Sequence, residues 1–369
     1  MRSPESHIDV PSLGGPPPRV TLVAASLEIL GGQGVQAQAL LEELRREGYP
    51  VCFLPVNPAF PAPLRWLRRV PYARTLLNQI LYLPSLIALR RTDVAHVFSA
   101  SYWSFLLAPA PALVAARLFG KRSVLHYHSG EAEDHLSRWG VLVHPWLRLA
   151  DEIVVPSQYL HDIFARHGYH TRVVRNVVDV MRFVYHERAR LRPRFLSARN
   201  LERPYRVDTV IEAFASLKRR YPHATLTIAG HGSDEPRLRA LTAALRVDGI
   251  RFLGRVEPEK VPELYAEADI FLNAAVVDNQ PVSVLEAFAA GLPVVTTGTG
   301  DIAAMTCHGE AGLLVPAGDP DAMAKAAATL LEHPQLALKL VRRAKAEVER
   351  YTWPWISAEW AAVYRGEPA

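Results

Sequence analysis

The feature that most constrains the fold is an alternation of short apolar runs with longer amphipathic stretches. Runs such as RVTLVAAS (Arg19–Ser26) and DEIVVPS (Asp151–Ser157) are predominantly apolar and have the length of one strand. Runs of this kind are typical of parallel sheets that are buried on both faces. The stretches between them, such as Val35–Arg46, have the length and periodicity of helices. The sequence therefore predicts an α/β protein with doubly wound parallel sheets.

The alternation ends at a polar, arginine-rich join near residues 181–193 and then starts again. The run RFLSARN (Arg194–Asn200) opens the second series, and PVVTT (Pro293–Thr297) is a late strand within it. A chain of 369 residues, 49% of them hydrophobic, has the length and apolar content for two cores. We therefore expect two halves of the same architecture. In such sheets, ligands bind in loops at the carboxyl ends of the strands.

Composition narrows the class of protein further. The formal net charge of +5 suits nucleotides, phosphates or an acidic membrane surface, but is too small to indicate nucleic acid. Cys52 and Cys307 are far apart, which fits neither a disulfide framework nor a zinc site, and this suits a reducing cytosol. Residues 1–18 lack the apolar segment of a signal peptide and are expected to be a disordered tail. The longest apolar run, Trp103–Gly120, is interrupted by prolines and an arginine and predicts a buried helix rather than a membrane span.

The stretch DNQPVSVLEAFAAGLPVVTT (Asp278–Thr297) places an acid on each side of a predicted helix start. Pro281 suits the first helical position, so Asp278 precedes the helix and Glu286 lies more than a turn inside it. Carboxylates accept hydrogen bonds from sugar hydroxyls, and free N–H groups at a helix start bind anions. Taken alone, the two acids have a simpler explanation, in which Asp278 caps the loop and Glu286 is solvated. The free N–H groups would belong to Val282, Ser283 and Val284.

The same stretch continues as GTGDI and then as HGEAGLLVPAGDPDAMAKAAATLLEHP. Together these motifs resemble the C-terminal half of the retaining, GT-B-fold glycosyltransferases of family 4, and the resemblance extends over nearly the whole chain after residue 18. It implies two Rossmann-like doubly wound domains that face each other across a cleft. The implied boundaries are an acceptor domain at 19–185, a nucleotide-sugar-binding domain at 186–350, and a C-terminal helix at 351–369 that packs on the first domain.

The resemblance also implies roles for residues of this stretch. Glu286 would bind the ribose hydroxyls of a nucleotide sugar. Asp278, where the family more often has glutamate, would lie near the donor sugar and the reacting carbon. The remaining donor-binding positions implied here are Asn279, Pro281, Val282 and Ser283.

Three further loops follow predicted strands. Gly31 and Gly32 have no side chains, so a phosphate or sugar could approach the backbone closely there. An ordinary tight loop explains these glycines equally well. His128 ends a predicted strand, where the family has a histidine that hydrogen-bonds the donor sugar, but a lone histidine is more often structural. Gly230 and Gly232 resemble the family's glycine loop beside the nucleotide.

The diphosphate contact departs from the family pattern, which has an arginine followed by a lysine. Arg199 takes the first place, and Tyr205 stands where the lysine is expected. Either Arg203 or Arg206 is left to supply the second charge, and we include Arg206 among the donor-binding residues. The residues predicted to be catalytic are Asp278, His128 and Arg199.

These observations lead to a functional hypothesis. The chain would be a retaining glycosyltransferase that moves a sugar from a nucleotide sugar to a saccharide or lipid-linked acceptor in cell-envelope or polysaccharide synthesis. No cofactor or metal is expected, because Asp319 and Asp321 are better explained as helix-capping acids than as a metal site. Two alternatives remain: a non-catalytic nucleotide-sugar-binding module, favoured by the missing lysine, and an epimerase or phosphorylase on the same architecture.

The segment Pro61–Arg91 mixes arginines with large apolar residues. This composition suits a helix that lies on an anionic bilayer surface. The other interpretation is a helix packed on the core with a solvated arginine face. The sequence leaves both open, so we expect a cytoplasmic protein that is either free or peripheral on the inner face of the membrane.

Overall fold

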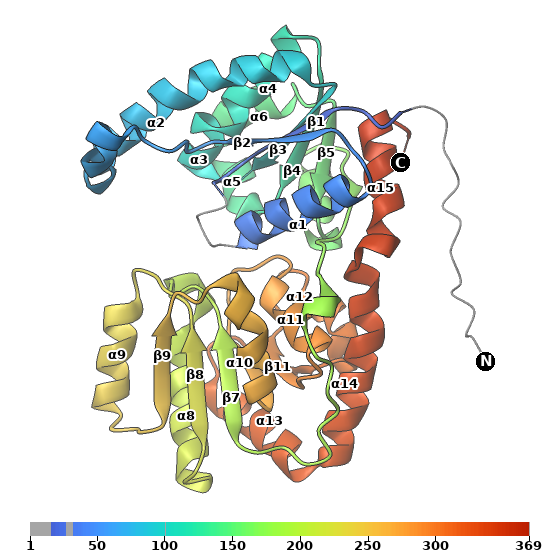
Figure 1. Ribbon diagram of the computed structural model, residues 1–369. Coiled ribbons are helices and arrows are strands. Elements are labelled where there is room, and N and C mark those ends of the chain that lie inside the picture. The colour runs from blue at the N-terminus through green and yellow to red at the C-terminus, as the bar shows by residue number, and fades with distance from the viewer. Residues whose placement is uncertain (1–15, 27–31, 100, 369) are drawn as a thin grey trace, which may run out of the picture.

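The computed structural model describes residues 16–26, 32–99 and 101–368. Two α/β halves lie one above the other, with the N-terminal half uppermost in Figure 1. Most of the tail predicted at 1–18, and the predicted donor-binding Gly31, lie outside the described residues.

The first half is built on a six-stranded parallel sheet in the order β2-β1-β3-β4-β5-β6. The inner strands are buried along their length because helices cover both faces of the sheet (Figure 1). The strands are β1 (Val20–Ala24), β2 (Val51–Pro55), β3 (Val94–Ser99), β4 (Arg122–Tyr127), β5 (Glu152–Val155) and β6 (Arg172–Val173). The helices are α1 (Gly32–Arg46), α2 (Pro71–Ser85), α3 (Tyr102–Leu107), α4 (Pro109–Leu118), α5 (Ala132–Arg138), α6 (Gly140–Leu147) and α7 (Gln158–Arg166).

The second half repeats this architecture in the order β12-β11-β10-β7-β8-β9, again all parallel. The prediction of two doubly wound parallel sheets is thereby confirmed. The strands are β7 (Arg194–Ala198), β8 (Thr225–Ala229), β9 (Ile250–Gly254), β10 (Ile270–Asn273), β11 (Val294–Thr297) and β12 (Leu313–Val315). The helices are α8 (Val207–Arg220), α9 (Glu235–Ala244), α10 (Val261–Glu267), α11 (Val282–Ala289), α12 (Ile302–Met305), α13 (Pro320–Glu332) and α14 (Pro334–Val348).

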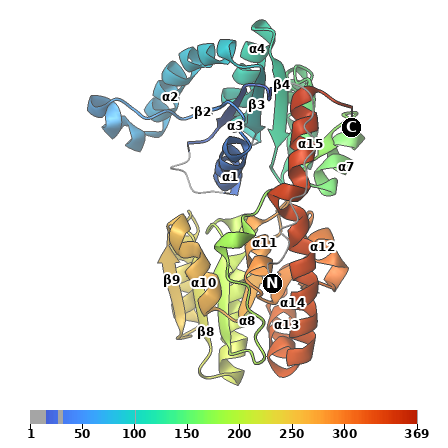
Figure 2. The ribbon, with the colours of Figure 1, turned by 45° about the vertical axis from the view of Figure 1, so that its right-hand side comes forward.

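The chain returns to the first half at its C-terminus. Helix α14 lies against α11 in the second half, and α15 (Trp353–Arg365) continues upward beside the first sheet, as Figures 1 and 2 show. Trp353 and Trp360 are buried in the same apolar cluster as Leu22 of β1. The indole N–H of Trp353 also donates to the Glu47 carboxylate at 2.6 Å. The two halves are therefore joined both by the central join and by this helical return.

Two apolar segments of the first half differ from simple buried helices. The single buried helix expected at Trp103–Gly120 is wrong: the backbone breaks at Ala108, before Pro109, and divides the segment into α3 and α4. Trp103 and Leu118 are exposed. The segment 61–91 folds as a 3-10 helix η1 (Ala62–Arg69), then α2, then a second 3-10 helix η2 (Leu86–Arg91). None of the described helices is long and apolar enough to cross a membrane.

Candidate active site

A cleft of about 960 Å³ lies between the carboxyl ends of the two sheets. The first half contributes the start of α1 and the loop after β4, residues 128–131. The second half contributes the loops that follow β7, β8, β9 and β10, together with the start of α11. This volume lies at the upper end of the roughly 300–1,000 Å³ of small-molecule sites. The cleft is therefore the place where the predicted site residues can meet one ligand.

Arg199 and Asp278 form the central ion pair of the cleft. The Arg199 guanidinium donates to the Asp278 carboxylate at 2.5 Å and to the Ser283 hydroxyl at 3.2 Å. The Tyr205 ring lies 4.3 Å from the same guanidinium carbon and so stacks on the cation. Burial raises the pKa of Asp278, and the neighbouring Arg199 charge opposes that shift. Tyr205, in the place of the expected lysine, thus fixes the orientation of Arg199 and adds no charge.

Glu286 lies one helical turn beyond Ser283, on the cleft side of α11. Its carboxylate accepts a hydrogen bond of 2.7 Å from the Tyr265 hydroxyl of α10. Burial raises the pKa of Glu286 to about 7, and the bond from Tyr265 works against this shift. A carboxylate held in this way has free lone pairs for hydroxyl groups of a ligand. Tyr265 was not predicted, because nothing in the sequence links it to Glu286.

The N-terminus of α11 opens onto the same space. Pro281 precedes the helix in an extended conformation, and no side chain of the described residues caps it. Its first N–H groups, at Val282 and Ser283, therefore remain for a ligand. Arg199 lies beside them through its bond to Ser283. Helix dipole and guanidinium together make this corner suited to an anion such as a phosphate.

His128 faces this corner from the first half. Its ring stacks on Phe98 at 5.3 Å and lies 4.0 Å from the His126 ring, measured between centroids. Burial lowers the pKa of His128 to about 3, so the ring is neutral near pH 7. Its Nε2 has no partner among the described residues. A neutral imidazole with one free nitrogen can hydrogen-bond a sugar hydroxyl without bringing a charge.

Two glycines of the loop after β8 allow close contacts between backbone segments. A Cβ on Gly230, which has φ +142°, would lie 1.9 Å from the Arg199 carbonyl oxygen. A Cβ on Gly232 would lie 2.2 Å from the Leu201 carbonyl oxygen, and Gly232 does not line the cleft. Gly230 therefore borders the cleft, whereas Gly232 packs the loop after β8 against the loop after β7. Gly32 is the first residue of α1, and its neighbours Gln33 and Gly34 line the cleft.

The two arginines considered as substitutes for the missing lysine lie off the cleft. Arg206 donates to Asp208 at 3.0 Å, at the start of α8, and is not among the lining residues. Arg203 is exposed and has its closest acid in Asp234, at 3.9 Å. Arg206 therefore does not line the cleft in this structure, and its donor-binding role stays a prediction. The lining arginines are Arg182, Arg199 and Arg255.

The residues after Asp278 also tie the two halves together. The Gln280 side chain accepts from the Asn176 backbone N–H at 2.8 Å and donates to the Pro156 carbonyl at 2.8 Å. The Ser157 hydroxyl donates to the Asn279 side chain. Asn279, a predicted donor-binding residue, thus lines the cleft and is also hydrogen-bonded to the first half. These contacts join residues more than 100 positions apart, so no sequence pattern predicts them.

The acids considered as a metal site have structural roles. The Asp319 carboxylate accepts from the Ala322 N–H at 2.8 Å and caps α13, as predicted. Asp321 lies in the first turn of the same helix. Across the described part of the chain, no group of three or more histidine, cysteine or acidic side chains is arranged to hold a metal ion.

Two facing Rossmann-like halves, a cleft between their carboxyl ends and a helical return at the C-terminus define a protein of the GT-B fold. Comparisons with known proteins agree. Residues 186–347 match the model of glycosyl transferases group 1, and residues 30–182 match that of glycosyltransferase family 4. The chain belongs to the group 1 family of glycosyltransferases.

Individual relatives extend over most of the chain. A glycogen synthase of Mycobacterium tuberculosis is 30% identical over 303 residues, which are 75% of this chain and 70% of the relative. Among solved structures, sucrose-phosphate synthase from Thermosynechococcus elongatus superposes with a TM-score of 0.76 at 19% identity, covering 95% of this chain and 98% of the other. Anabaena HepE in complex with UDP-glucose superposes with a TM-score of 0.73 at 17% identity, covering 95% of this chain and 100% of the other. Because the sequence identities to these two structures are below 20%, the structural similarity supports a shared fold and nothing more specific.

Proposed function

We propose that this glycosyltransferase transfers a sugar from a nucleotide-sugar donor, with retention of configuration, to a saccharide or lipid-linked acceptor. The observation that carries the proposal is the grouping of Arg199, Asp278 and Glu286 around the open N-terminus of α11, opposite His128. A nucleotide sugar has a diphosphate, a ribose and a sugar, and these residues offer a partner for each. The Anabaena protein of the same fold, solved with UDP-glucose, supports this choice of donor class.

Each part of the donor has its own set of contacts in the proposal. The ribose hydroxyls donate to Glu286, whose other bond, to Tyr265, fixes the carboxylate. The diphosphate lies at the start of α11 beside Arg199. The donor sugar lies between Asp278 and His128, and so between the two halves.

The chemical step needs few protein groups. The bond between the anomeric carbon and the phosphate oxygen breaks, and the acceptor oxygen bonds to the same face of that carbon. The acceptor proton passes to the departing phosphate oxygen, so no protein base is consumed. Arg199 and the helix dipole stabilise the negative charge that develops on the leaving diphosphate. Contact between the halves at Asn279 and Gln280 keeps water from the reacting carbon.

The biological setting proposed is polysaccharide or cell-envelope synthesis in the cytoplasm, without a metal or other cofactor. The curated relatives include a glycogen synthase and phosphatidyl-myo-inositol mannosyltransferases, which act on a polysaccharide and on a lipid respectively. Free cysteines at positions 52 and 307 are compatible with a reducing compartment.

A nucleotide-sugar panel tests the proposal. Purified wild type, Glu286→Ala and the exposed control Glu263→Ala are each incubated with UDP-, GDP- and ADP-sugars, while thermal shift and release of free nucleotide are followed. We expect one donor to stabilise wild type and control and to be slowly turned over, with both effects lost in Glu286→Ala. Binding without release would favour a non-catalytic module. No response to any donor would overturn the assignment of the site.

A further inference from the structure

The positive charge of the chain is concentrated in one segment. Residues 61–91 contain six arginines and no acidic residue or lysine, a charge of +6 against +5 for the whole chain, so the remainder sums to −1. No acid occurs between Glu47 and Asp93. The arginines of this segment that the structure describes form no ion pair with any described acid; they are Arg65, Arg69, Arg74, Arg90 and Arg91.

Large apolar side chains form a continuous exposed stripe along this segment. They lie at positions 72, 76, 80, 83 and 87, a spacing that places them on one face of α2 and its continuation η2. Each is at least 49% exposed. Tyr82 and Leu86, which are buried, hold the segment on the domain. The residues of this stripe are Tyr72, Leu76, Ile80, Leu83 and Ile87.

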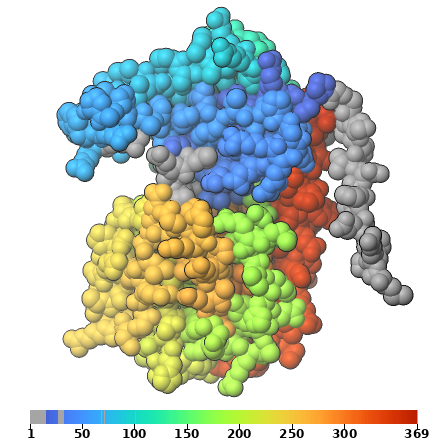
Figure 3. Space-filling model, in the orientation of Figure 1, coloured from blue at the N-terminus to red at the C-terminus, as the bar shows by residue number. Residues whose placement is uncertain are grey.

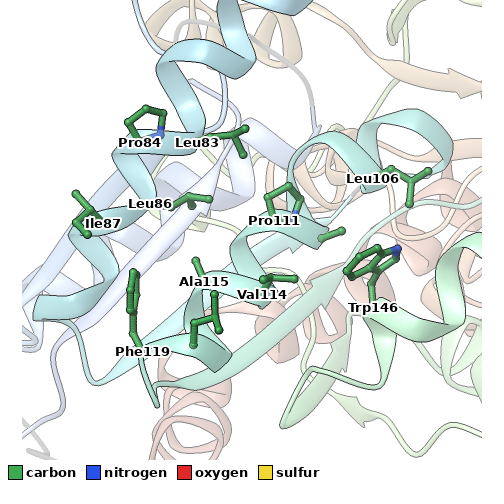
Figure 4. Close-up of a pocket in the computed structure, with 12 residues that line it drawn as sticks. Leu83, Pro84, Leu86, Ile87, Leu106, Pro111, Val114, Ala115, Phe119 and Trp146 are labelled. Atoms are coloured by element: carbon green, nitrogen blue, oxygen red, sulfur yellow. The ribbon is translucent and has the colours of Figure 1, made fainter.

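The stripe leads into an apolar groove of about 430 Å³ between α2, α4 and α6 (Figure 4). Leu83 and Ile87 line one side, and Pro111 and Trp146 line the other. The Arg90 guanidinium lies 5.2 Å from the centre of the Phe119 ring, which also lines the groove. A basic side chain therefore borders the groove, and arginines also precede the stripe at its N-terminal end.

A contiguous exposed apolar surface of this kind marks an interaction site. We propose that the stripe and groove dock the first half on an anionic lipid bilayer. The apolar side chains enter the acyl region, while the arginines at both ends of the stripe bind lipid phosphates, which suits their long stems and unpaired charges. A bilayer fits better than a protein partner, because the surface is basic and apolar without any acidic residue.

The stripe lies on the same half of the molecule as part of the cleft, so docking could bring a lipid-linked acceptor to the cleft. The Asn78 amide of α2 donates to the Val56 carbonyl at 2.8 Å, just beyond the carboxyl end of β2, at the same edge of the sheet as the cleft. The N-terminal end of α2 extends beyond the body of the first half in Figures 1 and 3. The docking itself is independent of glycosyl transfer. Its use to present a lipid-linked acceptor rests on the proposed function.

Vesicle flotation tests the docking. The full chain is mixed with vesicles of phosphatidylcholine alone, or with about one-third phosphatidylglycerol, at low and high salt. We expect binding to the anionic vesicles, and a loss of about tenfold or more in Leu76→Glu with Ile80→Glu. Arg65→Gln with Arg69→Gln should lower binding to the level of neutral vesicles. Val184→Glu and Arg219→Gln, which change an exposed apolar and a basic residue elsewhere, should bind as wild type does.

Three further measurements, of folding, donor turnover and oligomeric state, distinguish a failure of the docking from a failure of the proposed function. Circular dichroism confirms that the variants fold, and donor turnover on a soluble acceptor should be unchanged in all of them. Wild type that ignores anionic vesicles, or variants that bind as well as wild type, would overturn the docking. A dimer that Leu76→Glu with Ile80→Glu converts to a monomer, without vesicle binding, would show instead that the stripe joins two copies of the chain.

Discussion

Two of the carboxylates that line the cleft, those of Asp278 and Glu286, are held in different ways. Asp278 has a full counter-charge in Arg199, which is itself oriented by Ser283 and by the Tyr205 ring. Among the described residues, Glu286 forms no ion pair and accepts a hydrogen bond from the neutral hydroxyl of Tyr265. Asp278 and Arg199 can therefore stay ionised as a pair when a charged ligand arrives. The charge of Glu286 depends on pH and on what the ligand donates to it.

Glu286 should make both stability and donor binding depend on pH. Its pKa is raised from near 4.5 to about 7, so its contribution to stability is complete below pH 4.5 and is lost as the pH rises through 7. Glu286→Gln has no charge to bury. Its free energy of unfolding should therefore rise relative to that of wild type as the pH increases from 4.5 to 7, by up to about 3 kcal/mol. Chemical denaturation at several pH values measures this difference.

Donor binding should change in the opposite sense over the same interval. Hydroxyl donors favour the ionised carboxylate, so the wild-type affinity should rise between pH 5.5 and 8 by about tenfold or less. Glu286→Gln should bind more weakly and without this pH dependence. Equal pH dependence in the two proteins would show that another group is responsible.

At the scale of helices and strands, the sequence predicted most of the fold because buried parallel strands are short apolar runs with clear boundaries. The strands β2, β6 and β12 were not identified, and β12 has only three residues. The first has exposed residues at the sheet edge, and the second has only two residues. The break between α3 and α4 was also missed, because a proline that begins a new helix looks the same in sequence as one inside a helix.

The loop after β4 should tolerate no side chain at Gly130. A Cβ there would lie 2.8 Å from backbone atoms of Asp278, across the contact between the halves. Gly130→Ala should reduce glycosyl transfer by at least tenfold, because it pushes Asp278 away from His128, with a stability loss of about 1–3 kcal/mol. Gly298→Ala is the matched control, because its Cβ would find ordinary contacts at 3.8 Å and beyond. Transfer assays and thermal melts of both variants check this, and full activity in Gly130→Ala would contradict it.

The helical return should contribute much of the stability of the first half. Trp360 is buried and lies 4.8 Å from the His96 ring, between centroids, whereas Trp355 on the same helix is exposed. Trp360→Ala should cost about 3–5 kcal/mol in the free energy of unfolding, and Trp355→Ala within about 0.5 kcal/mol. Urea unfolding of the two variants measures the difference. Equal losses would mean that α15 does not depend on this packing.

At the scale of the whole molecule, the sequence predicted the loops that carry the site but not the contacts between the halves. Arg199, His128 and Asp278 follow predicted strand ends, Glu286 lies in the helix after one of them, and all four line the cleft. Arg206 and Gly232 follow strand ends too, yet a local carboxylate and a backbone contact hold them elsewhere. Such differences depend on side-chain direction, which a pattern of residue types does not contain.

The contacts of Gln280 should hold the two halves together. Its side chain bonds to Asn176 and Pro156 of the first half and to Asp301 of the second. Gln280→Leu preserves the size of the side chain but leaves buried polar partners unsatisfied, so the halves should separate more readily. We expect a larger radius of gyration in small-angle scattering and a fall in kcat of at least tenfold. Gln158→Leu, at an exposed site, should change neither, and an unaltered scattering profile in Gln280→Leu would argue against this role.

The central claim is that this cleft breaks the bond between a sugar and a nucleoside diphosphate and retains the configuration of the sugar. Proton NMR of slow donor hydrolysis, with the donor that responds in the nucleotide-sugar panel, tests it most directly, because the first sugar released shows its anomeric configuration before mutarotation. We expect this sugar to have the configuration of the donor, and Asp278→Asn and Arg199→Ala to release it at least a hundredfold more slowly. Release of the opposite anomer, or equal release by the variants, would contradict it.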